Sequence, residues 1–322
     1  MLIEHQHPHN RSITASVIGA PNVGKSSLIN YLLGTDLSIV THKAQTTRNR
    51  FQCVFTVDHT EIILIDTPGF HQSSIEINKR MNEQAREGAE GADINLLLID
   101  LTKELLPQFE NIKNHIKKEL NETWVVFTKA DKFGELDEQE MLPLVEKARE
   151  IHPNIVKYFV LSAKTGDNMH ELIGALCDKA PEGPHLYNKG QISNKHVRFF
   201  IAEYVRQQVF ELLNEELPYE VAVTVDEYED FRRKPDSKIG ASIQATIHVN
   251  RPSQRAIVVG SKGSMIKEIG IRARKKIEDL IGSQVGLKLH VKVSQRWFKN
   301  NFILEELGLP RAENSNRVWR AK

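Results

Sequence analysis

The chain has 322 residues, of which 40% are hydrophobic and 26% are charged, and its formal net charge is +1. This composition is ordinary for a globular protein, and the length suits two domains that each bury a core. Two cysteines are too few for a disulfide framework or a cysteine metal site, and no apolar run approaches the roughly 20 residues that span a bilayer. We therefore expect a cytoplasmic protein.

The small net charge conceals two oppositely charged segments. Residues 203–230 contain nine acidic residues and one arginine, whereas residues 251–300 contain twelve lysines or arginines and three acidic residues. An acidic run of this kind is typical of a solvated surface, but a strongly basic segment indicates an anionic partner.

The first motif is a glycine-rich loop between a predicted strand and a predicted helix. Residues 19–26 read GAPNVGKS, apolar residues 13–18 precede them, and the helical spacing of residues 28–33 follows. Such a loop lets backbone N–H groups converge on an anion, and the start of the helix adds partial positive charge. We expect Lys25 to reach the outer phosphates of a nucleoside triphosphate and Ser26 to bind Mg²⁺. The predicted phosphate-binding residues are Gly19, Asn22, Val23, Gly24, Lys25, Ser26 and Ser27.

The next apolar strand, residues 62–65, ends in the second motif, Asp66-Thr67-Pro68-Gly69. An aspartate at the end of this strand can hold the metal through water, and the N–H of Gly69 can contact a γ-phosphate. A further apolar run, residues 94–101, predicts another strand of the same sheet.

Two later strands, residues 124–127 and 156–161, end in residues that suit guanine. Thr128-Lys129-Ala130-Asp131 follows the first and Ser162-Ala163-Lys164 follows the second. Guanine presents two adjacent donors, N1–H and the exocyclic amine, and one carboxylate such as Asp131 accepts both. Lys129 would pack over the base, and a backbone N–H near Ala163 would meet its O6. Each motif alone could be a surface turn, but their order at successive strand ends predicts a GTP site.

The order GxxxxGKS, DTPG, TKAD and SAK resembles the translation-factor-class GTPases, and Gln45-Thr46-Thr47-Arg48 resembles the first switch of the Era family. The resemblance implies a GTPase with a Ras-like P-loop α/β domain and a mostly parallel sheet. It implies that Thr46 or Thr47 completes the Mg²⁺ shell, and we favour Thr47. The predicted metal ligands are then Ser26, Thr47 and Asp66. Because this family more often has asparagine where Thr128 stands, we expect a weaker hold on the base.

The residue after Gly69 is Phe70, where Ras-like enzymes place a glutamine that orients the attacking water. His71 could act as the base, although a supporting or exposed histidine is the commoner role. The Era resemblance implies instead that Asn22 helps to coordinate K⁺, and a turn residue with an unusual backbone conformation is an equal alternative. We expect slow hydrolysis that K⁺ stimulates more than Na⁺, with Lys25, Asn22, Thr47 and Gly69 as the catalytic residues.

The second half of the chain predicts a separate α+β domain. A helix over residues 196–213, strands over 221–228 and 241–250, a helix from Pro252, a helix over 264–281 and a strand over 285–293 follow one another. Residues 256–259 alone would also suit a strand. The loop Gly260-Ser261-Lys262-Gly263 precedes the long helix, which is the arrangement of a type II KH domain, whose groove holds about four unpaired nucleotides.

This loop and the basic positions after it form the predicted RNA-binding surface. Its residues are Gly260, Ser261, Lys262, Gly263, Lys267, Arg274 and Lys275. Residues 255–271 closely resemble the corresponding part of the Era family, so the resemblance covers nearly the whole chain. The expected organisation is a GTPase domain over 11–180, a linker over 181–194, a KH domain over 195–300 and a basic tail over 301–322.

The resemblance implies a monomeric assembly factor for the 30S ribosomal subunit that binds single-stranded 16S rRNA near its 3′ end, with GTP or GDP, Mg²⁺ and K⁺ as ligands. GTP would order residues 35–50 and 68–80 and change how the second domain is held. One alternative is a regulatory GTPase on the inner membrane that couples growth or the cell cycle to an anionic lipid surface. Another is a binding protein for which the nucleotide is only a structural ligand.

Overall fold

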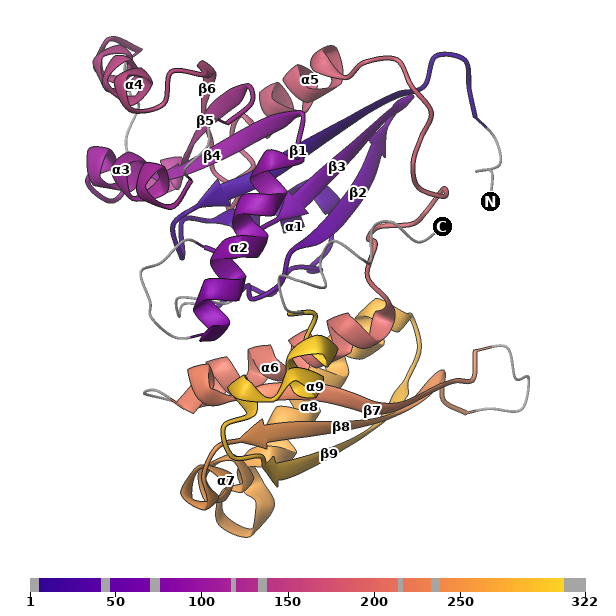
Figure 1. Ribbon diagram of the computed structural model, residues 1–322. Coiled ribbons are helices and arrows are strands. Elements are labelled where there is room, and N and C mark those ends of the chain that lie inside the picture. Colours follow the sequence, from indigo (N-terminus) through magenta and orange to yellow (C-terminus); the bar gives the residue numbers. More distant parts are fainter. Residues whose placement is uncertain are drawn as a thin grey trace. The chain divides into compact units, whose positions relative to one another are not determined.

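The computed structural model describes residues 6–41, 47–69, 76–116, 120–132, 138–213, 217–232 and 238–309. The chain divides into two compact units, each built around its own sheet (Figure 1). The first unit takes Met1–Ser38 and Ala44–Asn194, and the second takes Ile39–Lys43 and Lys195–Lys322.

The first unit contains a six-stranded sheet of order β2-β3-β1-β4-β5-β6. Its strands are β1 (Arg11–Gly19), β2 (Phe51–Val57), β3 (Thr60–Asp66), β4 (Ile94–Asp100), β5 (Thr123–Thr128) and β6 (Ile155–Val160). Neighbouring strands are parallel except for the β2–β3 hairpin. Strands β3, β4 and β5 are buried along their whole length, as expected where helices cover both faces of a parallel sheet. The mostly parallel sheet confirms the predicted fold class.

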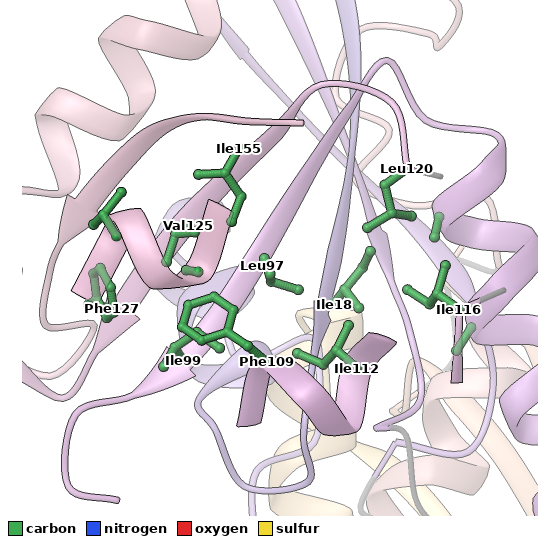
Figure 2. Packing of buried hydrophobic residues seen from close by; sticks show 14 of the residues in the cluster. Ile18, Leu97, Ile99, Phe109, Ile112, Ile116, Leu120, Val125, Phe127 and Ile155 are labelled. Carbon is green, nitrogen blue, oxygen red and sulfur yellow. The ribbon is translucent and has the colours of Figure 1, made fainter. Parts of the chain in front are cut away.

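Helices pack on both faces of this sheet. They are α1 (Lys25–Leu33), α2 (Glu76–Glu90), α3 (Leu105–His115), α4 (Glu138–Ile151) and α5 (Met169–Lys179), with a 3₁₀ turn η1 (Ala130–Lys132) after β5. Figure 2 shows Leu97, Ile99 and Phe127 of the strands packed beside Phe109 and Ile112 of α3. Because side chains alternate along a strand, the intervening residues of β1 and β4 face the other side, where α1 and α5 contact β1 and β3.

The second unit places helices on a three-stranded sheet of order β7-β8-β9. Its elements are α6 (Val197–Leu212), η2 (Leu217–Glu220), β7 (Ala222–Asp230), β8 (Ala241–Val249), α7 (Pro252–Val259), η3 (Ser261–Gly263), α8 (Ser264–Ile281), β9 (Val285–Val293), η4 (Trp297–Lys299) and α9 (Asn301–Glu306). Strand β8 is antiparallel to β7 and parallel to β9. The order matches the predicted type II KH arrangement, and residues 256–259 lie in α7 rather than in a strand.

Residues 181–194 have a linker composition, but they pack against the first unit. The carboxylate of Glu61 accepts hydrogen bonds from the backbone N–H groups of Leu186 and Tyr187 at 2.7 and 3.0 Å. Val54 N–H of β2 donates to the Ile192 carbonyl at 3.0 Å, so this segment covers the edge of the sheet. An edge strand exposes unpaired backbone groups, and the segment satisfies part of that row.

Described residues near each end of the chain pack within their own unit, which the sequence did not indicate. Residues 301–309, expected as part of a tail, form α9 and the turn after it, because Ile303, Leu304 and Leu309 are buried. Near the other end, Gln6 Nε2 donates a hydrogen bond to the His185 carbonyl at 3.1 Å. Gln6 therefore contacts the first unit, although the first domain was expected to begin at residue 11. The remaining tail, including Trp319, lies outside the described residues.

Candidate functional site

The glycine-rich loop joins the end of β1 to the start of α1, as the sequence predicts. A Cβ on Gly19 would lie 2.8 Å from the Leu98 carbonyl oxygen, so glycine is required for this close approach. Asn22 and Gly24 have φ angles of 61° and 107°, which is the left-handed region. Asparagine tolerates this region better than most residues, which agrees with a turn role for Asn22.

The side chain of Lys25 is buried within this loop. Its ammonium donates hydrogen bonds to the carbonyls of Gly19 and Ala20 at 3.0 and 2.8 Å. Burial lowers the pKa of Lys25 to about 8, although the nearby Asp66 carboxylate opposes that shift. The Lys25 ammonium therefore lies among backbone carbonyls of the loop, at the N-terminal end of α1. A helix N-terminus favours a bound anion, and the ammonium lies beside that position.

The predicted metal ligands come from three separate segments. Ser26 Oγ on α1 lies 3.2 Å from Thr47 Oγ1, so the structure brings these two hydroxyls together. Asp66 ends β3 and is fully buried, and its Oδ2 accepts a hydrogen bond from Ser38 Oγ at 2.7 Å. Gln45 and Thr46 lie outside the described residues. Hydroxyl and carboxylate oxygens are the donors that Mg²⁺ prefers, so this set fits the ion.

The residues after Asp66 contact the first strand and the glycine-rich loop. Thr67 Oγ1 donates to the Val17 carbonyl of β1 at 2.6 Å. A Cβ on Gly69 would lie 2.9 Å from Pro21 N, so the Gly69 backbone packs directly on the loop, next to the buried Pro68. Phe70 and His71 lie outside the described residues.

Thr128, the departure from the family pattern, connects the base-binding motif to the phosphate loop. Its Oγ1 lies 2.6 Å from the Val23 carbonyl, to which it donates, and 3.2 Å from the Ile99 carbonyl. The hydroxyl therefore still joins the two loops. A threonine hydroxyl has one proton to donate, whereas an asparagine amide has two.

The other residues predicted to contact guanine lie close to one another. Ser162 Oγ donates to Asp131 Oδ1 at 2.8 Å, and Lys164 Nζ lies 3.8 Å from Asp131 Oδ2. Ser162 Oγ also lies 3.2 Å from the backbone N of Lys164, which orders the turn around Ala163. The Asp131 carboxylate is thus supported from the loop after β6.

Asp100, which belongs to none of the motifs, forms an ion pair with the predicted base-binding residue Lys129. Its Oδ2 lies 2.6 Å from Lys129 Nζ, and its side chain is buried at the end of β4. Burial alone would raise the pKa of Asp100, but hydrogen bonds from Lys129 and Thr102 outweigh burial and lower it. Asp100 therefore anchors the lysine that is expected to pack over the base. The same strand-end rule that selected Asp66 could have selected it.

The loop after β6 also depends on Tyr31, which the motif analysis did not single out. Gly166 has a φ of 87°, and any Cβ placed on it would collide with the Tyr31 hydroxyl. Tyr31 belongs to α1, so the helix that begins at the phosphate loop also limits the position of the base loop.

In the second unit, the predicted RNA-binding loop is a tight 3₁₀ turn, η3, between α7 and α8. A Cβ on Gly260 would lie 2.8 Å from Met265 N, and Lys262 itself has a left-handed φ of 51°. Ile269, Ala273, Ile277 and Ile281 are buried along α8. The predicted phosphate-directed side chains, Lys262, Lys267, Arg274 and Lys275, are all exposed.

Among the described residues, no cluster of His, Cys, Asp and Glu side chains has the arrangement of a metal site. No described helix combines the length and apolar character required to cross a membrane.

Two families match separate parts of the chain. Residues 14–129 match the family described as 50S ribosome-binding GTPase, and residues 216–298 match the KH domain family. GTPase Era of Thermotoga maritima is 34% identical over 295 residues, which cover 91% of this chain and 96% of that protein. GTPase Era of Syntrophus aciditrophicus is 35% identical over 292 residues, with coverage of 91% and 93%.

Solved structures agree with these sequence matches over both units. A crystal structure of Era in complex with MgGDPNP and nucleotides 1506–1542 of 16S ribosomal RNA has a TM-score of 0.85 and 34% identity, covering 94% of this chain and 100% of that chain. An Aquifex aeolicus Era variant bound to GDP and AlF4⁻ has a TM-score of 0.83, with the same identity and coverage.

Proposed function

The chain belongs to the Era family of GTPases, with a GTP-hydrolysing domain followed by a KH domain, and from this premise we propose that it acts in 30S subunit assembly. In this proposal the KH unit binds single-stranded 16S rRNA near its 3′ end. The observation that carries the proposal is the likeness, across 94% of the chain, to an Era structure that contains nucleotides 1506–1542 of 16S rRNA.

The geometry of the second unit supports this RNA-binding role. A Cβ on Gly263 would meet no atom within 4 Å, so this glycine leaves open space at the turn where another backbone can approach closely. Lys262 lies within that turn and Lys267 lies one turn into α8, and both are exposed. Their charges can contact phosphates, which provide affinity that depends on salt.

The test is the binding of a fluorescent single-stranded RNA with the 3′-terminal sequence of 16S rRNA. We expect the substitution Lys267→Glu to weaken binding by about tenfold or more and to reduce the salt dependence of affinity, because a phosphate contact is lost. Lys113→Glu, which makes the same charge change on α3 of the first unit, is the matched control. Equal affinities for the two variants, or equal binding of the complementary RNA strand, would contradict the proposal.

We further propose roles for individual residues of the nucleotide site. Ser26, Thr47 and Asp66 hold Mg²⁺, which neutralises charge on the phosphates when it is bound. Lys25 and the Gly69 N–H contact the outer phosphates, together with the loop residues Gly19, Asn22, Val23, Gly24 and Ser27. Asp131 selects guanine, with Lys129 over the ring and support from Thr128, Ser162, Ala163 and Lys164. The convergence of Ser26 with Thr47 and of Asp131 with Ser162 supports these assignments.

The proposed role of Asn22 in binding K⁺ makes a separate prediction. An additional cation at the phosphates would stabilise the charge of the transition state without an arginine finger. We expect faster GTP hydrolysis in KCl than in NaCl of equal concentration, and we expect Asn22→Ala to remove the difference. Steady-state phosphate release measures both rates. Equal rates of the unsubstituted protein in the two salts would remove Asn22 from the catalytic residues.

A further inference from the structure

Ser38 and Asp66 form a buried hydrogen bond beside the proposed magnesium ligands. The Ser38 hydroxyl donates to Asp66 Oδ2 at 2.7 Å. Ser38 is 3% exposed and Asp66 is 0% exposed, so water does not compete strongly for this bond. The two residues are 28 positions apart in the chain, and no sequence motif links them.

Ser38 is itself held by α1 through the side chain of Asn30. Asn30 Nδ2 donates to the Ser38 carbonyl at 2.7 Å, and the Ser38 N–H donates to Asn30 Oδ1 at 2.7 Å. Asn30 is 9% exposed and lies one helical turn after Ser26. Residues four apart share a helix face, so α1 carries Ser26 and the anchor of Ser38 on the same side.

We propose that Asn30 and Ser38 are positioning residues that orient the Asp66 carboxylate for magnesium. The two amide hydrogen bonds of Asn30 fix the backbone of Ser38, and its hydroxyl then fixes the direction of the carboxylate. Hydrogen bonds to a metal-ligating carboxylate orient it before the ion arrives and thereby strengthen metal binding. This inference rests on the proposed role of Asp66, whereas Asn30 and Ser38 need not touch the ion or the nucleotide.

The opposite role for Ser38 would be to obstruct the carboxylate. A hydroxyl that occupies Asp66 Oδ2 in competition with the magnesium shell would weaken metal binding, and its removal would strengthen it. A purely structural hydroxyl would change protein stability and leave the effect of magnesium unchanged. The sign and size of one measured ratio therefore separate the three roles.

The experiment measures how much Mg²⁺ tightens the binding of fluorescently labelled GDP, as the ratio of dissociation constants in EDTA and in saturating MgCl₂. We expect Ser38→Ala and Asn30→Ala each to lower this ratio by about tenfold, while affinity in EDTA stays close to that of the unsubstituted protein. Since both residues act through one chain of contacts, the double variant should lose no more than the larger single effect. An unchanged or increased ratio in Ser38→Ala overturns the proposal.

Ser16→Ala is the matched control, because Ser16 is also fully buried and its hydroxyl hydrogen-bonds Asn95 Oδ1 of the neighbouring strand. We expect Ser16→Ala to lower the melting temperature without changing the magnesium ratio. Asp66→Asn tests the underlying assignment. If Asp66→Asn keeps the full ratio, the proposed role of Asp66 fails. If Asp66→Asn loses it while Ser38→Ala and Asn30→Ala retain it, only the positioning role fails.

Discussion

At the scale of single residues, burial changes the protonation of Lys25, the side chain proposed to contact the phosphates. Its pKa is lowered to about 8 by burial, against an unfolded value of about 10.4. Between these values the unfolded chain holds the proton and the native chain does not. The contribution of Lys25 to the stability of the nucleotide-free protein therefore increases from about pH 8 to about pH 10.

Phosphate oxygens favour the charged ammonium, so nucleotide binding should raise the pKa of Lys25 and take up a proton above pH 8. We expect up to one proton to be taken up per GDP bound at pH 8.5, and far less at pH 7.2. Affinity should fall as pH rises through about 8, approaching tenfold per pH unit. Calorimetric titrations in two buffers that differ in ionisation enthalpy count the protons. The absence of proton uptake at pH 8.5 would contradict a lowered pKa at Lys25.

At the scale of elements, the turn after β6 depends on its contact with α1. Both Gly34 and Gly166 have positive φ angles, of 65° and 87°. A Cβ on Gly34 would meet no atom within 4 Å, whereas a Cβ on Gly166 would collide with Tyr31. The pair therefore separates the cost of the backbone conformation from the cost of crowding between two elements.

We expect Gly34→Ala to lower the free energy of unfolding by about 1 kcal/mol through its backbone conformation alone. Gly166→Ala should cost up to about 1 kcal/mol more, because the methyl group must displace the exposed Tyr31 ring. Scanning calorimetry of the full chain measures both losses. In the background of Tyr31→Ala, the additional loss from Gly166→Ala should disappear. If the two alanine substitutions cost the same in the original background, crowding by Tyr31 does not constrain the turn.

At the scale of the whole molecule, the chain order supports communication between the nucleotide and the KH unit. Residues 39–43 belong to the second unit, although they lie between Ser38 and the proposed magnesium ligand Thr47 in the sequence. Only a few residues of chain therefore separate Thr47 from this segment of the second unit. This continuity supports the hypothesis that GTP and GDP states differ in how the second domain is held.

We expect the affinity for the 3′-terminal 16S RNA to differ between the protein bound to a non-hydrolysable GTP analogue and the protein bound to GDP. A coupling of 1–3 kcal/mol corresponds to roughly 5- to 150-fold. By reciprocity, RNA must change the ratio of GTP-analogue and GDP affinities by the same factor. Titrations of RNA onto the protein in both nucleotide states measure this coupling once. Titrations of both nucleotides with and without RNA measure it a second time, independently. Identical RNA affinities in the two states would exclude the coupling.

The sequence alone determined the features that depend on short-range pattern. Apolar runs located β1, β3, β4, β5 and β6, and helical spacing located α8 at its observed bounds. The glycine-rich loop and the strand-end motifs located most of the candidate site, because glycine, lysine and carboxylate at fixed spacing follow from phosphate and guanine chemistry. The spacing of apolar residues did not predict β2, which pairs antiparallel with β3 at the edge of the sheet. It also did not predict the helix α9 and the turn after it, within residues 301–309.

Only the tertiary structure decided which distant side chains meet. Asp100 and Lys129 are 29 positions apart, and Ser38 and Asp66 are 28 apart, and neither pair follows from a motif. The packing of residues 181–194 on Glu61 and Val54 was equally hidden, since a polar, proline- and glycine-containing segment can be free or bound. Such contacts depend on how parallel strands and the helix after the phosphate loop align in space, and that alignment results from the packing of the whole unit.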